Sequence, residues 1–110
     1  MLPKKLKIPI KEFPQRSTLC FRGERFSIKK VANKYDYPRF GVVVSKKTSP
    51  KATVRNWVKR TTYNFFGEHL SKIPKGTDLL VVVGGHIMEV SLETKEALRK
   101  ELTRAIETLK

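Results

Sequence analysis

The segment that most constrains the fold is Gly41–Arg60, GVVVSKKTSPKATVRNWVKR, in which an apolar run passes directly into a basic helical pattern. The three valines after Gly41 are typical of a strand that is buried on both faces. Pro50 suits the first position of a helix, and Ser49 is expected to cap that helix. A second apolar run over residues 78–83 follows the helix. The chain therefore contains a strand, a helix and another strand in succession, which indicates an α/β pattern.

The rest of the chain adds strands before this unit and one helix after it. Residues 1–16 carry three prolines, and Pro14 would keep any helix around Phe13 short. Gly23 separates two strand-like segments, and Ser91 is expected to cap the last helix. The expected elements are strands over 18–22, 25–32, 39–45 and 78–83, and helices over 50–66 and 92–109. We expect one domain that spans residues 1–110.

The helix over 50–66 has two chemically different faces. At 100° per residue, one arc holds the side chains expected to pack on the sheet, which are Val54, Trp57, Val58, Thr61 and Phe65. The other side holds hydrogen-bonding and cationic side chains, which are Lys51, Arg55, Asn56, Lys59 and Arg60. Lys46 and Lys47 precede the helix and add to its charge. A cluster of like charges repels itself, so an anionic partner is the simplest reason for it.

The distribution of charge supports such a partner. Residues 1–60 hold 17 Lys and Arg against 3 Asp and Glu, whereas residues 61–110 hold 7 of each class. The whole net charge of +14 therefore lies in the first part of the chain. Nucleic acid is the favoured polyanion. A membrane surface is disfavoured because the basic residues are not paired with a long amphipathic apolar face.

Cysteine and hydropathy bound the class of protein further. Cys20 is the single cysteine, so neither an intrachain disulfide nor a cysteine zinc site can form. No segment approaches the roughly 20 apolar residues that span a bilayer. These observations predict a soluble protein of the cytoplasm.

The acidic and histidine residues do not suggest a protein active site. A protein nuclease that uses Mg²⁺ needs clustered carboxylates. Glu12, Glu24 and Asp36 are widely spaced, and His69 and His86 lack nearby metal-ligand patterns. We therefore expect the polypeptide alone not to be catalytic.

The basic segment also carries a family resemblance. Arg39-Phe40-Gly41, the SKK at Ser45–Lys47, an alanine, a valine, Arg55-Asn56 and Lys59-Arg60 resemble the signature of the protein subunit of bacterial ribonuclease P. The opening LPKK, Phe13, and Gly76-Thr77-Asp78 before LLVVV resemble other parts of that family. Trp57 departs from the pattern, because the family usually has an arginine there. Trp57 could stack on a base, but packing at the edge of the core is favoured.

The resemblance implies a fold and a division of labour. The fold would be an α+β sandwich with one mixed four-stranded sheet, the element order α-β-β-β-α-β-α and a left-handed β-α-β crossover. The partners would be ribonuclease P RNA, which holds the active site and uses Mg²⁺, and precursor tRNA, whose 5′ end the holoenzyme matures. The protein alone would be a monomer and a non-catalytic subunit of an endoribonuclease.

The resemblance and the charge pattern together assign candidate residues. Contact with the catalytic RNA is expected from Lys46, Lys47, Lys51, Arg55, Asn56, Lys59 and Arg60. Contact with the single-stranded 5′ leader is expected from Phe13, Phe21, Lys29, Arg39 and Phe40. The aromatic face of each phenylalanine could stack on an unpaired base. For Phe40, burial in the core is an equal alternative. A small ribosomal or other structural RNA-binding protein is the alternative function, and a DNA-binding helix is a weaker one.

Overall fold

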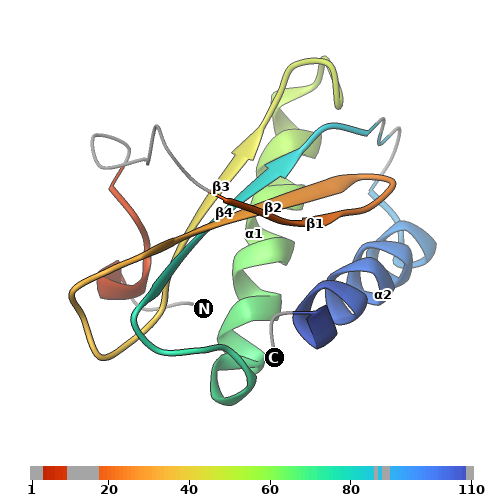
Figure 1. Cartoon of the computed structure of the whole chain (residues 1–110). Coiled ribbons are helices and arrows are strands. Elements are labelled where there is room, and N and C mark those ends of the chain that lie inside the picture. Colours follow the sequence, from red (N-terminus) through yellow and green to blue (C-terminus); the bar gives the residue numbers. More distant parts are fainter. Residues whose placement is uncertain (1–3, 10–17, 86, 88–89, 109–110) are drawn as a thin grey trace.

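The computed structural model describes residues 4–9, 18–85, 87 and 90–108, which form a two-layer α+β fold. One layer is a four-stranded sheet, and both long helices cover the same face of it (Figure 1). The elements in chain order are η1 Lys4–Leu6, β1 Thr18–Arg22, β2 Phe26–Ala32, β3 Arg39–Val44, α1 Ala52–Glu68, η3 Leu70–Lys72, β4 Thr77–Val83 and α2 Leu92–Thr108. The expected α+β class is therefore confirmed.

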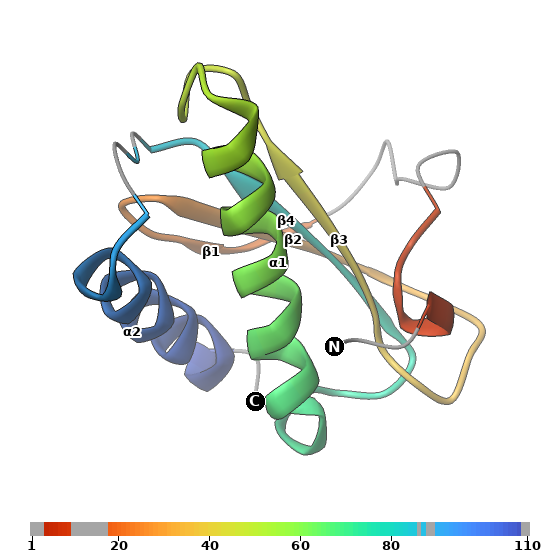
Figure 2. The same ribbon diagram turned by 180° about the vertical axis from the view of Figure 1, so that it is seen from behind.

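The sheet is mixed and has the order β1-β2-β4-β3. β3 and β4 are parallel, and the other two pairs are antiparallel. In the view from the helix side, β3 and β4 point upward, α1 lies in front of them, and β4 lies to the left of β3 (Figure 2). The β3–α1–β4 crossover is thus left-handed, as the resemblance implied, whereas nearly all such units are right-handed.

The core lies between the sheet and the two helices. β2 and β4 contribute Phe26, Ile28, Val81 and Val83, none of which is exposed. Phe40 of β3 stacks on Phe66 of α1, with ring centroids 4.6 Å apart. Each fully buried side chain of this size contributes about 1.5–3 kcal/mol relative to exposure. These contacts fix α1 on β3 and set the direction of its opposite, solvent-facing side.

The expected strand boundaries are confirmed to within one residue, but the start of the first long helix is wrong. α1 begins at Ala52 rather than Pro50, and the Lys51 side chain at its N-cap makes no capping hydrogen bond. The Oγ of Ser49 instead accepts from the backbone N–H of Lys51 at 3.2 Å, within the preceding turn. Burial of Thr48 and Ser49 holds the turn, so the helix starts after it. The short helix expected around Phe13 lies outside the described residues.

A buried ion pair fixes the first residues of β3 and β4 against each other. The Nη2 of Arg39 lies 2.7 Å from Oδ2 of Asp78, and its Nε donates to Oδ1 at 3.0 Å. The side-chain amide of Asn33 donates to the same Oδ1 at 2.7 Å. Arg39 and Asp78 are 8% and 5% exposed, respectively. This network fastens the β2–β3 loop to the sheet at the end opposite to the β3–α1 turn.

The final helix forms as expected, with one addition. The Oγ of Ser91 accepts from the backbone N–H of Thr94 at 3.1 Å, which confirms the predicted cap. Leu98, Leu102 and Ala105 are buried against the core, and Glu101 is buried among them. No helix in the described part of the chain is both long and apolar enough to cross a bilayer.

Candidate nucleic-acid interface

The turn between β3 and α1 is held by buried hydroxyl groups. The backbone N–H of Thr48 donates to the carbonyl of Ser45 at 3.0 Å, and its Oγ1 donates to the carbonyl of Val83 at 3.0 Å. The turn is therefore tied to the end of β4 as well as to β3. Lys46 and Lys47 in this turn are exposed. The hydrogen bonds within the turn hold the backbone of these two lysines in one position.

Arg55 joins the turn to the first part of α1. Its Nη1 donates to the backbone carbonyl of Ser49 at 2.9 Å, and the residue is half-buried. This hydrogen bond leaves other donors of the planar guanidinium for a ligand, because arginine carries five N–H groups. Arg55 is thus oriented before any partner arrives, which lowers the entropy cost of binding.

The outward face of α1 is polar, basic and without carboxylates nearby. Lys51, Asn56, Lys59 and Arg60 are all exposed. At 1.5 Å per residue, Lys51 and Arg60 are about 14 Å apart along the helix axis. Among the described residues, no ion pair involves these side chains or Lys46, Lys47 or Arg55. The first turn of the helix contains no acidic residue either. The surface is therefore positively charged along its length.

We call the seven residues Lys46, Lys47, Lys51, Arg55, Asn56, Lys59 and Arg60 the α1 basic surface. The structure brings all of them together around one turn and one helix face. Trp57 lies at the border of this surface and packs against the core while half-buried, which confirms the favoured core-edge position. The helix is thus fixed on one side and presents the basic residues on the other.

The five residues assigned to the leader do not form one surface. Phe40 is fully buried and stacked on Phe66, so the structure supports the core alternative for it. Arg39 is buried in its ion pair with Asp78, and this arrangement argues against a role on an open surface. Phe21 is paired with Ile28 on the helix side of the sheet, next to α2. Phe13 lies outside the described residues.

Lys29 remains on the face of the sheet that the helices leave open. It is exposed and lies opposite Leu19 of β1 and Leu80 of β4 in the strand register. Leu19 is 48% exposed, and Val43 of β3 is 37% exposed on the same face. Leu19 and Val43 were missed by sequence reasoning. Alternation along the strands could have identified them, because residues two apart point to the same face.

The titratable groups with shifted pKa values are scattered rather than clustered. Burial raises the pKa of the Cys20 thiol, although the charge of Lys30 acts in the opposite direction. Burial also raises the pKa of Tyr63, whose hydroxyl oxygen accepts from the backbone N–H of Val42. Within the described residues, no group of three or more His, Cys, Asp or Glu side chains is placed to hold a metal ion.

The fold and the charged surface together define a small basic α+β protein with a candidate polyanion-binding face. The structure of a Staphylococcus aureus RNase P protein mutant with defective mRNA degradation activity aligns with 94% of this chain and 87% of its own, at a TM-score of 0.73 and 22% identity. The RNase P protein from Thermotoga maritima aligns with a TM-score of 0.64 and 28% identity over 82% of each chain. These likenesses establish a shared fold.

The sequence comparisons establish the family. The model of the family described as Ribonuclease P matches residues 13–110, so the chain belongs to the ribonuclease P protein family. It is 39% identical over 61 residues to the ribonuclease P protein component of Thermotoga maritima. This match covers 56% of this chain and 51% of that protein. It is 42% identical over 48 residues to the ribonuclease P protein component of Synechocystis, and this match covers 44% of this chain and 39% of that protein. The matched part thus spans about half the length of these relatives or less.

Proposed function

We propose that this chain is the protein subunit of a ribonuclease P holoenzyme and that it binds the catalytic RNA through the α1 basic surface. The observation that carries the proposal is a preformed set of cations on a hydrogen-bonded turn and a helix, none of which has an ion-pair partner in the described part of the chain, in a chain of this family. Phosphate groups would neutralise these cations and release condensed counterions, which drives association at low salt. Arg55 and Arg60 suit bidentate phosphate contacts, and the lysines act as point charges.

The 5′ leader of precursor tRNA would lie along the open face of the sheet. Lys29 offers a phosphate contact there, and Leu19 and Val43 offer apolar area for unstacked bases. This assignment replaces Phe21 and Phe40, whose side chains lie on the helix side of the sheet, and Arg39, which is buried in its ion pair with Asp78. The active site would belong to the RNA, which would also hold the Mg²⁺ ions. The protein would be a cytoplasmic monomer. It would position the substrate and raise the affinity of the holoenzyme for it, in the cleavage that matures the 5′ end of tRNA.

Reconstitution tests this function directly. The purified full chain is mixed with ribonuclease P RNA from its own source and with a precursor tRNA at low Mg²⁺. We expect cleavage to be faster than with RNA alone. A protein that binds the RNA without accelerating cleavage would instead be a structural RNA-binding protein, and the proposal would fall.

A matched pair of variants tests the surface. Lys59→Gln combined with Arg60→Gln removes two charges from α1, and Lys72→Gln combined with Lys75→Gln removes two exposed charges near the other end of the sheet. Each lost phosphate contact lowers the slope of log K against log salt by about 0.7–0.9. We expect a decrease of about 1.5 for the α1 pair and little change for the control pair. Equal slopes for the two variants would refute the assignment of the surface.

A further inference from the structure

A second basic surface lies between the β1–β2 hairpin and α2, away from the α1 basic surface. Arg22 and Arg25 from the hairpin, with Lys100 and Arg104 from α2, line a hollow of about 370 Å³. We call it the hairpin–α2 hollow. The distribution of charge along the sequence does not indicate this surface, because residues 61–110 are neutral overall. The fold places two cations of that part of the chain next to two cations of the first part.

The hollow has a fixed shape because Glu101 fastens the hairpin to α2. The buried carboxylate of Glu101 accepts from the backbone N–H of Arg25 at 2.9 Å and of Phe26 at 2.6 Å. Gly23 lies so close that a Cβ there would be 2.8 Å from Oε2 of Glu101. The hydrogen bonds within the protein therefore satisfy this carboxylate, and the close approach sets the distance between the two elements.

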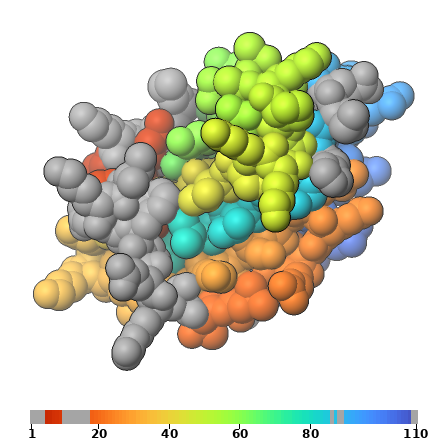
Figure 3. Space-filling view, turned by 90° about the horizontal axis from the view of Figure 1, so that it is seen from above, coloured from red at the N-terminus to blue at the C-terminus, as the bar shows by residue number. Residues whose placement is uncertain are grey.

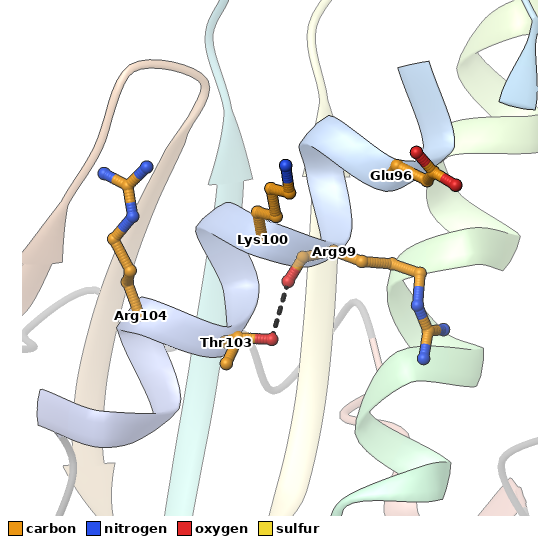
Figure 4. Close-up of a pocket in the computed structure, with 5 residues that line it drawn as sticks. All are labelled: Glu96, Arg99, Lys100, Thr103 and Arg104. Atoms are coloured by element: carbon orange, nitrogen blue, oxygen red, sulfur yellow. Dashed lines mark hydrogen bonds between the residues drawn. The ribbon is translucent and has the colours of Figure 1, made fainter. Parts of the chain in front are cut away.

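The cations that face the hollow have few internal partners. Lys100 and Arg104 are one turn apart and project to the same side of α2, whereas Arg99 projects to the other side (Figure 4). Arg99 is paired with Glu68 of α1 at 2.9 Å. Among the described residues, Arg22, Lys100 and Arg104 make no side-chain hydrogen bond or ion pair, and all three are exposed.

Two carboxylates also line the hairpin–α2 hollow. Glu24 in the hairpin turn is 3.6 Å from Nη1 of Arg25, so these two charges compensate each other. The Oε1 of Glu101 lies 3.7 Å from the same Nη1. Arg22, Lys100 and Arg104 remain as cations that face solvent. A neighbouring hollow of about 430 Å³ on α2, drawn in Figure 4, shares Lys100 and Arg104 with the first.

The hairpin–α2 hollow and the α1 basic surface extend from the same end of the sheet. Phe26 of β2, Val83 of β4 and Val44 of β3 lie in one row of the strand register. The β1–β2 turn precedes Phe26, and the β3–α1 turn follows Val44, so both turns extend beyond this row. Two strand spacings separate β2 from β3, which is about 10 Å. Figure 3 shows cyan β4 lying between yellow β3 and orange β2.

We propose that the hairpin–α2 hollow binds backbone phosphates of an RNA through Arg22, Lys100 and Arg104, as a contact additional to the α1 basic surface. This inference rests on the proposed function. An arginine fork and a lysine from facing elements suit phosphodiester oxygens and carry no base readout. Gly84, which follows β4 between the two surfaces, has open space where a side chain would be. The phosphates belong either to ribonuclease P RNA or to precursor tRNA.

The test compares two triple variants of the full chain. The first is Arg22→Gln, Lys100→Gln and Arg104→Gln. The control is Lys34→Gln, Lys72→Gln and Lys75→Gln, which removes three exposed charges nearer the opposite end of the sheet. Binding to ribonuclease P RNA and to precursor tRNA is measured separately against salt. Thermal unfolding of both variants should match the wild type, because all six side chains are exposed.

We expect the first variant to lower the salt slope by about 2 for one of the two RNAs and to weaken its binding on the order of 10- to 100-fold at 0.1 M salt. The control should change the slope by less than about 0.5. The RNA that is affected identifies the source of the phosphates. Equal slopes for the variant and the control with both RNAs would overturn this inference alone. A wild-type chain that binds neither RNA would overturn the proposed function and this inference together.

Discussion

The Asp78→Ala variant tests whether the ion pair with Asp78 stabilises the fold and so engages the Arg39 guanidinium inside the protein. Asp78→Ala deletes the acceptor of two hydrogen bonds from the Arg39 guanidinium and of one from Asn33. Arg39 is 8% exposed, so water replaces the lost carboxylate poorly. Removal of one partner of a buried ion pair costs about 3–5 kcal/mol. We therefore expect the free energy of unfolding to fall by about 4 kcal/mol.

This loss corresponds to a large change in Tm. At roughly 2.1 cal/mol/K per residue, the unfolding entropy of a 110-residue chain is about 0.23 kcal/mol/K. Tm should accordingly fall by about 17 °C. Thermal unfolding followed by circular dichroism measures it, with urea unfolding as a second estimate of the free energy. The change is a large fraction of the 5–15 kcal/mol that typically stabilises a domain.

A double variant makes the reasoning refutable. Arg39→Met combined with Asp78→Leu replaces the ion pair with apolar side chains and leaves no unpaired buried charge. We expect it to be at least about 2 kcal/mol more stable than Asp78→Ala. Glu68→Ala is the control, since it breaks an exposed pair with Arg99 of similar length, 2.9 Å, and should cost less than about 1 kcal/mol. If Asp78→Ala costs no more than Glu68→Ala, the buried pair does not hold β3 and β4.

Two further predictions concern the edge of the core and the surface pair. Trp57→Ala should lower the free energy of unfolding by about 2 kcal/mol, roughly half the loss for a fully buried tryptophan. Asn56→Ala on the exposed face should change it by no more than about 0.5 kcal/mol. Equal losses for the two variants in urea unfolding would refute the packing of Trp57 against the core. The hydrogen bond from Arg99 lowers the pKa of Glu68 below 4.5, so ionised Glu68 stabilises the fold above that pH and the effect is lost as pH falls through the lowered pKa. The small stability difference between the wild type and Glu68→Gln should thus be present at neutral pH and be lost as the pH falls through the lowered pKa of Glu68, and a difference that grows on acidification would contradict it.

The sequence by itself determined most of the secondary structure, because hydrophobic periodicity and local turn chemistry are properties of neighbouring residues. The start of α1 is the exception, since the buried turn of Thr48 and Ser49 moves it to Ala52. The alternation and length of the apolar runs placed four strands within one residue of their observed boundaries. Ser91 was identified as a helix cap because its partner is only three residues away. The α1 basic surface was equally predictable, since every residue of it lies within Lys46–Arg60. Helical geometry puts its four α1 residues on one side, and Lys46, Lys47 and Lys51 directly precede the helix.

Only the tertiary structure decided the contacts between residues far apart in the chain. Arg39 was expected on an open surface, but its partner Asp78 lies 39 residues later and buries it. Phe40 could not be distinguished from a ligand-binding aromatic until Phe66 was placed over it. The left-handed crossover was implied by resemblance alone, because local periodicity is the same for either hand. The hairpin–α2 hollow depends on Glu101, whose acceptor role requires backbone N–H groups 75 and 76 residues away. Local pattern thus specified the elements and one charged face, whereas burial and long-range pairing decided which of the remaining polar side chains are free to meet a partner.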